Sequence, residues 1–564
     1  MEYKEGFFCE SKDFLINIQN CEQVMREIRF TILLFILIIT FIIKQSIGSV
    51  KKENKNMIQK LADVKLNVRP IFIGLIHQYR YEGPCRFGQG EELEKDYDIM
   101  ANMELYKQFK EDVKKHMPEE VNLLEPIYVE RDDWFLSREE MFEKMAEGIE
   151  NVDFYLFSFG IGRGDIYVEF AQRYHKPQAV MPYQCCEAAV NTSAVRNRGF
   201  EAYAYRNWED LTVHMKVLRT RKVLASTRVL LASRFNSSRS YSSSDNFVDL
   251  NYVTEKLGVQ FRYLNVHELF DQLHMVDPAS NPTLPGRKAY NITPEDMIEI
   301  EKISDELIAG ADEVRMERDM VISSVKAYYL VNKLLDVYGC NAFTIPCPDA
   351  CSTRRLNEEK ITFCLTHSLN NENGIPSACE FDINALLGMT VMESLSHQAA
   401  YMGNTNAVMY KDGKMIPLQG FSDEDLKHIT DERENLYLTF HSTPNRNMHG
   451  YGKEKSSYGL APFAYSGFGA TIRYDFSQDA GKEITLMRFA PDAKRLFVGK
   501  GKVVAGSGYD RVNCDEGVFF AVENQEDFFY KQINFGNHMI ITFGNYVKEL
   551  QMLGECLGME VVTA

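Results

Sequence analysis

The chain has 564 residues, of which 45% are hydrophobic and 25% charged, and this composition is typical of a folded globular protein. Such a length exceeds one hydrophobic core and predicts about three domains. The formal net charge of −17, without a long stripe of lysine and arginine, argues against a nucleic-acid-binding protein because phosphate binding needs a basic face.

Residues 1–60 are predicted to be a signal or anchor segment and a linker. Residues 30–43 are apolar apart from two threonines. As a helix they would span about 21 Å, short of the roughly 30 Å hydrocarbon core, whereas their length fits the apolar region of a signal peptide. A start at Met25 would supply a basic region, with a cleavage site near Gly48. Residues 25–48 thus predict an exported or periplasmic protein, with a membrane anchor or a buried helix as the alternatives.

Strands alternate with helices in an N-terminal α/β domain, residues 66–222. This order predicts a parallel sheet with right-handed crossovers. The strands are expected at 69–76, 153–160 and 178–184, and the helices at 137–152 and 164–177.

A second α/β domain is expected over residues 223–400, followed by a β-rich C-terminal domain over 401–564. The second domain begins with a strand at 228–233, a serine-rich loop and a helix–strand–helix run, and continues with a long amphipathic segment, 293–338. The C-terminal domain has short β segments with Gly and Asp turns, which predict an antiparallel sheet or barrel. A last helix is expected at 546–557. The predicted fold class is α/β, with two doubly wound parallel-sheet domains followed by the β-rich domain.

The segment FGIGRGD, residues 159–165, follows a predicted strand. It lacks the complete dinucleotide-binding spacing and the lysine of a P-loop, so a turn that requires glycine is the favoured interpretation. Arg163 is still a candidate for substrate binding, since α/β sheets bind ligands at the carboxyl ends of their strands. A nucleotide-dependent enzyme is the corresponding alternative function.

Two carboxylates, Glu380 and Asp382, lie in the otherwise apolar run at 374–395. Asp382 directly precedes residues with helical spacing, which predicts a helix N-cap. Glu380 lies outside that helix, and an unpaired buried charge is expensive, so Glu380 is the better functional candidate.

Histidines and cysteines offer few further candidates. His441 ends a hydrophobic strand and His538 begins one, and binding sites are often built where strands end. The twelve cysteines include no CxxC pair; the nearest spacing, Cys347-x-x-x-Cys351, has no histidine at zinc-ligand distance in the sequence. Most cysteines are therefore interpreted as small buried hydrophobic residues.

Four stretches together resemble the L-fucose isomerase family and, more distantly, the L-arabinose isomerases. They are IGLIHQYRYEGPCRFG (73–88), GCNAFTIPC (339–347), GIPSACEFDINALLGMTVMESLSHQAAYMGNTN (374–406) and GNHMIITFGNYVKELQMLGECLGMEV (536–561). The resemblance implies two α/β domains and a C-terminal β-rich domain, assembled as hexamers in the cytoplasm. It also implies a divalent cation, typically Mn²⁺, held by a Glu, an Asp and a His.

The implied metal ligands fall on Glu380, Asn404 and His538. The family's aspartate belongs 24 positions after the glutamate, where this chain has Asn404. An amide oxygen can still bind Mn²⁺ or Mg²⁺, but it carries no charge and cannot take a proton.

The leading hypothesis is an aldose–ketose isomerase acting on a pentose or a 6-deoxyhexose through an enediol. Glu380 would bind the metal and act as a base, with Asn404 as a weak ligand in the catalytic set. His441 would contact sugar hydroxyls or relay a proton. The alternative is a sugar-binding protein of the same fold that has lost catalysis. The expected partners are a monosaccharide and further copies of the chain, with membrane contact only through an uncleaved N-terminal segment.

Overall fold

The computed structural model describes residues 59–83, 88–132, 138–159, 164–234, 243–275, 290–427, 429 and 433–564. The predicted signal or anchor segment, Arg163 and part of the serine-rich loop lie outside these residues. Within the described ranges, no helix combines the length and the apolar character that a membrane crossing requires.

The first sheet has six strands, and all of its pairings are parallel. The order is β2-β1-β4-β5-β6, and β3 also pairs with β1. The strands are β1 (Leu66–Ile76), β2 (Val121–Leu123), β3 (Ile127–Asp132), β4 (Phe154–Phe159), β5 (Gln178–Val180) and β6 (Ala202–Ala204). The central strands β1 and β4 are almost continuously buried, as expected for a parallel sheet covered on both faces.

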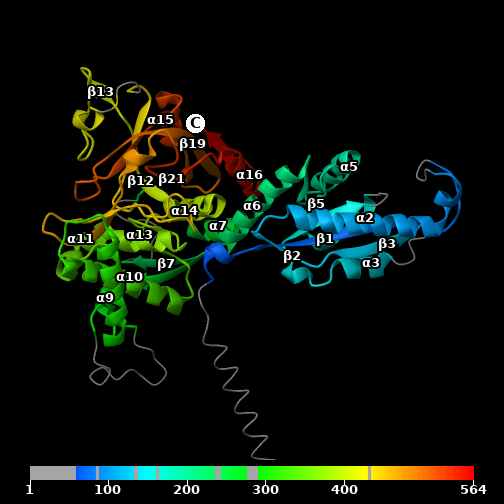
Figure 1. Ribbon diagram of the computed structural model, residues 1–564, viewed down its shortest axis with the longest axis horizontal. Helices are drawn as coiled ribbons and strands as arrows, with labels where there is room; N and C mark the ends of the chain where they lie inside the picture. Colours follow the sequence, from blue (N-terminus) through cyan, green and yellow to red (C-terminus); the bar gives the residue numbers. More distant parts are fainter. Residues whose placement is uncertain are drawn as a thin grey trace, which may run out of the picture. The chain divides into compact units, whose positions relative to one another are not determined.

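Helices cover both faces of this first sheet. One core cluster joins Phe72 of β1 to Phe109 of α2, and the other joins Ile73 of β1 to Phe142 of α3. Figure 1 shows α2 and α3 on opposite sides of β1. The helices are α2 (Lys95–His116), α3 (Arg138–Met145), α4 (Asp165–Tyr174), α5 (Cys185–Arg196) and α6 (Trp208–Ala225), with short 3₁₀ turns η1 (Leu61–Asp63), η2 (Gly90–Leu93) and η3 (Ile149–Asn151).

The second sheet has four parallel strands in the order β11-β10-β7-β8. They are β7 (Arg228–Ser233), β8 (Gln260–Asn265), β10 (Ala342–Thr344) and β11 (Ser377–Ala378). The associated helices are α7 (Leu250–Leu257), α8 (Val266–Gln272), α9 (Pro294–Gly310), α10 (Arg318–Tyr338), α11 (Cys347–Ser352), α12 (Arg355–Glu359), α13 (Cys364–Glu372) and α14 (Ile383–Ser396). The amphipathic segment predicted at 293–338 thus forms two helices, α9 and α10, and the first begins at a Thr293 capping box followed by Pro294.

The third sheet contains seven strands in the order β18-β21-β12-β15-β20-β19-β22. An additional pairing of β18 with β19 closes six of them into an antiparallel ring, while β22 joins β19 in parallel. The strands are β12 (Tyr401–Ala407), β15 (Leu436–Phe440), β18 (Glu483–Phe489), β19 (Arg495–Ser507), β20 (Gly517–Ala521), β21 (His538–Phe543) and β22 (Glu560–Thr563). The predicted strand-rich C-terminal region is therefore confirmed.

Smaller elements complete the described chain. β9 (Glu313–Val314), β16 (Gly459–Pro462) and β17 (Ala470–Arg473) form a three-stranded sheet, and β13 (Tyr410–Lys411) pairs with β14 (Lys414–Met415). The other elements are η4 (Asp423–Leu426), η5 (Phe476–Asp479), α15 (Gln525–Gln532) and α16 (Val547–Leu557). Helix α16 confirms the last helix predicted from the sequence.

Helix α14 connects the second sheet to the third, because it starts shortly after β11 and packs against β18 and β21. Its sequence is mostly apolar, and nearly its whole length is buried. At Gly388 a Cβ would come within 2.8 Å of Ile540, so glycine allows the close approach of α14 and β21. This packing fixes the N-terminus of α14 beside the first residue of β21, His538.

Candidate metal centre

Glu380 lies in an unusual backbone turn between β11 and α14. Both Glu380 and Phe381 have a φ of 60°, in the left-handed region that non-glycine residues rarely adopt. Three hydrogen bonds hold the turn: Phe381 N–H donates to the Ile345 carbonyl at 3.0 Å, Ser243 Oγ to the Glu380 carbonyl at 2.9 Å, and Asn246 Nδ2 to the Phe381 carbonyl at 2.8 Å. Such strained turns persist only where surrounding structure determines them, and they cluster at functional sites.

Asp382 caps α14, as the sequence predicts: its Oδ1 accepts a hydrogen bond from the Ala385 N–H at 2.8 Å. The carboxylate has a further role that the sequence pattern did not indicate. Its Oδ2 lies 2.9 Å from Nη1 of Arg488 and 2.9 Å from Nδ1 of His538, and all three side chains are buried.

The charges around Asp382 determine the protonation of His538. Burial favours the neutral acid, but the Arg488 charge and the hydrogen bond from His538 outweigh burial and hold the pKa of Asp382 below its usual range. Burial likewise disfavours the charged form of His538, but the hydrogen bond to Asp382 outweighs it and raises the His538 pKa. Because an ionised carboxylate can only accept, Nδ1 of His538 carries a hydrogen, and Nε2 is the atom left to bind a ligand.

His441 and His538 both face Glu380. His441 directly follows β15, His538 begins β21, and both strands pair with β12. Nε2 of His441 lies 3.5 Å from Oε1 of Glu380, and Nε2 of His538 lies 3.8 Å from Oε2. Both histidines are buried, and neither Nε2 has a hydrogen-bond partner within the described structure.

Glu380, His441 and His538 together fit a divalent cation. One ligand atom from each lies within 4.8 Å of the other two. A buried imidazole nitrogen without a partner is costly, and a cation shared with the carboxylate would satisfy both histidines. One carboxylate and two imidazoles suit Mn²⁺ and related divalent ions, and the Asp382–His538 hydrogen bond is the kind of outer contact that orients a metal-binding histidine.

Asn404, the third metal ligand implied by the family resemblance, lies in β12 directly across from His538. Paired residues of antiparallel strands project their side chains on the same face. The Asn404 amide oxygen accepts a hydrogen bond from Nδ2 of Asn537. His441, expected to contact sugar hydroxyls or relay a proton, completes the group with Glu380 and His538. Its role toward sugar and metal binding by Asn404 both stay predictions.

A pocket of about 500 Å³ opens next to Asn404 and His538. Its lining includes Thr405 and Asn537, the sequence neighbours of Asn404 and His538, together with apolar residues of the β13–β14 region and α15. Its described lining contains none of the three grouped residues. The pocket therefore flanks the centre on the side of Asn404.

The serine-rich loop also reaches the centre, through the bond from Ser243 to the Glu380 carbonyl. A second group of side chains that sequence spacing did not indicate brings Cys347, His367 and Cys379 together. The histidine of this group lies in α13, between the two cysteines in sequence but outside the usual zinc-motif spacings, so no local pattern could reveal it.

Comparison with known proteins adds no assignment to these features. The chain matches no family model, and no curated protein matches it. The resemblance to L-fucose isomerases accordingly stays a prediction based on the quoted sequence stretches.

Proposed function

We propose that the protein is a metal-dependent isomerase that interconverts an aldose and a ketose, either a pentose or a 6-deoxyhexose, through an enediol. The proposal rests mainly on one observation: Glu380, His441 and His538 converge, and the buried Nε2 atoms of the two histidines have no hydrogen-bond partner in the described structure. Further support comes from the family resemblance, which implies Glu380 and His538 as ligands.

In this proposal Glu380, His441 and His538 hold Mn²⁺ or Mg²⁺, and Asn404 is a further neutral ligand. When bound, the ion would polarise the substrate oxygens on C1 and C2 and so acidify the C2 proton. The Glu380 carboxylate takes the proton from C2 and returns it to C1, while the proton of the O2 hydroxyl passes to O1, so that the reaction is redox-neutral overall. Asp382 keeps the His538 ring oriented, and burial of the two histidines limits access of water.

The proposed architecture follows the family: two doubly wound α/β domains at 66–222 and 223–400, and a β-rich domain at 401–564. The parallel first and second sheets and the ring of strands in the third are compatible with it. We also propose a homo-oligomer, a hexamer by resemblance. Analytical ultracentrifugation would measure its mass, and a monomer at micromolar concentration would contradict this part.

The test uses the purified protein, stripped of metal and reloaded with Mn²⁺, with a panel of pentoses and 6-deoxyhexoses in D₂O. Proton NMR would detect ketose formation and also exchange of the C2 hydrogen with solvent, which reports enediol formation even when turnover is slow. We expect both signals with at least one sugar, and their loss in Glu380→Gln. Glu526→Gln, at an exposed position of α15, is the matched control and should keep them. Metal-loaded protein without exchange for any sugar would overturn the isomerase proposal.

A sugar-binding protein without catalysis is the second candidate, favoured by the uncharged Asn404 and its hydrogen bond to Asn537. Binding of a sugar by calorimetry, with no hydrogen exchange in the NMR panel, would select this candidate.

A further inference from the structure

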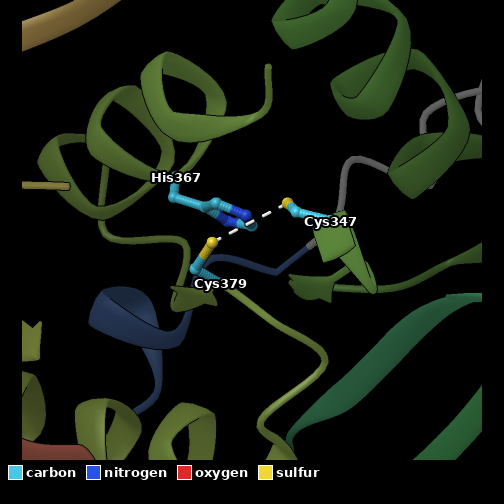
Figure 2. A group of neighbouring side chains, drawn as sticks. All are labelled: Cys347, His367 and Cys379. Carbon is cyan, nitrogen blue, oxygen red and sulfur yellow. Dashed lines mark hydrogen bonds between the residues drawn. The ribbon is translucent and has the colours of Figure 1, made fainter. Parts of the chain in front are cut away.

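Three side chains with soft or borderline ligand atoms meet where two strands of the second sheet end. In the parallel pairing of β10 and β11, Thr344 lies opposite Ala378. Cys347 follows β10 by three residues, and Cys379 directly follows β11. The carboxyl ends of parallel strands meet at one edge of a sheet, which is where α/β proteins bind ligands. His367 reaches the same place from α13 (Figure 2).

The three ligand atoms lie close together, and the side chains that carry them differ in burial. The sulfur atoms of Cys347 and Cys379 lie 3.7 Å apart, and one ligand atom from each of the three residues lies within 4.8 Å of the others. Figure 2 shows the His367 ring directed toward the pair of sulfur atoms. Cys379 is buried and Cys347 is half-buried.

The surroundings of His367 point to a ligand at its Nε2. The side chain is fully buried, its Nδ1 lies 2.8 Å from Oγ of Ser377, and its ring stacks on Phe343 with centroids 5.9 Å apart. In the tautomer in which Nδ1 donates to Oγ of Ser377, the lone pair is on Nε2, which has no hydrogen-bond partner in the described part of the chain. This arrangement resembles the way that an outer hydrogen bond orients a metal-binding histidine.

A pair of inert thiols or a disulfide explains this arrangement less well. The sulfur separation of 3.7 Å exceeds the roughly 2.05 Å of a disulfide bond. A disulfide would also leave the buried Nε2 of His367 unsatisfied, and a neutral thiol could satisfy it only as a weak S–H donor.

We propose that Cys347, His367 and Cys379 form a second metal site, specific for Zn²⁺ or a similar thiophilic divalent cation. Zn²⁺ binds well to two thiolates and one imidazole, whereas Mn²⁺ and Mg²⁺ favour oxygen ligands. Three protein ligands leave one of the four tetrahedral positions for a water or another small ligand. The site is distinct from the one proposed around Glu380, although Cys379 and Glu380 are consecutive in the chain, and it does not depend on an isomerase activity.

Cobalt substitution of the full-length reduced protein tests the site directly. Co²⁺ bound to cysteine gives a near-ultraviolet charge-transfer band, which oxygen and imidazole ligands do not give. We expect this band in the wild type and its displacement by one equivalent of Zn²⁺ per chain. Cys347→Ser, Cys379→Ser and His367→Gln should each weaken Co²⁺ and Zn²⁺ binding by more than about tenfold, the lower end of the loss seen even for outer-contact variants.

Two control variants separate the sites and the thiols. Cys340→Ser removes a buried thiol outside the group and should keep the band. Glu380→Gln should keep the band as well, because it alters only the neighbouring centre. Circular dichroism would identify any variant that does not fold, and the half-buried Cys347 gives the variant best able to keep the fold. Co²⁺ binding without a charge-transfer band, a band that survives in folded Cys347→Ser, or a Cys347–Cys379 disulfide in freshly purified metal-free protein would each overturn the proposal.

Discussion

The Asp382 carboxylate accepts a hydrogen bond from Nδ1 of His538 at 2.9 Å while its other oxygen caps helix α14. One side chain therefore couples the start of a buried helix to the orientation of a candidate metal ligand. The pairing is possible because α14 packs tightly along β21, whose first residue is His538.

Replacing Asp382 by asparagine separates these two roles. Asparagine remains a good N-cap, but it removes the negative charge that fixes the hydrogen on Nδ1 of His538. We expect Mn²⁺ affinity, measured by calorimetry, to fall about 10- to 100-fold, the usual loss for such outer contacts.

Asp249→Asn is a matched control for Asp382→Asn. Asp249 caps α7 in the same way, by accepting from the N–H groups of Asn251 and Tyr252. This variant should keep the wild-type Mn²⁺ affinity. Equal affinities in folded Asp382→Asn and wild type would contradict the orienting role of Asp382.

His441→Gln tests whether His441 binds the metal or only the sugar. If His441 binds the metal through Nε2, its replacement should lower Mn²⁺ affinity by at least about tenfold in the absence of any sugar. Electron paramagnetic resonance of free Mn²⁺ would measure this affinity. His449→Gln is the control, since His449 bonds to Asp479 outside the group. Unchanged metal affinity together with a weaker interaction with sugar would return His441 to a substrate-binding role.

Asn404→Asp adds a carboxylate beside His538. If Asn404 contributes to the metal centre, the added charge should raise Mn²⁺ affinity by about one order of magnitude or more, because ligand charge tunes the affinity of oxygen sites. Asn406→Asp places the same charge on the same face of β12, about 6.6 Å farther along the strand. A comparable effect of both substitutions in calorimetry would show a general charge effect and contradict a ligand role for Asn404.

Local sequence patterns predicted the features that depend on neighbouring residues. The aspartate before a run of helical spacing identified the cap at Asp382, and alternating strands and helices identified parallel sheets. Glu380 could be singled out as a candidate site residue because no local structural role explained it.

The remaining parts of the candidate site depend on long-range packing. His441 and His538 follow Glu380 by 61 and 158 residues, and only the ring of strands in the third sheet brings them to it. The bond between Asp382 and His538, like the meeting of His367 with two cysteines, arises from contacts between elements. No periodicity or motif spacing encodes such contacts.

The burial of Glu393 predicts a stability that depends on pH independently of the metal centre. This residue of α14 is 6% exposed, and it accepts a hydrogen bond from the Ala400 N–H at 3.3 Å. Burial raises its pKa from 4.5 to about 8, although hydrogen bonds from Ala400 and Tyr451 partly oppose this rise. Between these two pH values the folded protein holds a proton that the unfolded chain has lost.

The sign of the effect follows from this proton. The stability contributed by neutral Glu393 is fully present below about pH 4.5 and is lost as the pH rises through about 8. Glu393→Gln cannot ionise, so the unfolding free energy of the wild type relative to this variant should fall by a few kcal/mol between pH 5 and pH 9. Urea unfolding at several pH values would measure it, with the exposed Glu526→Gln as a control whose difference from wild type stays constant. A constant difference for Glu393→Gln as well would show that Glu393 ionises normally in the folded protein.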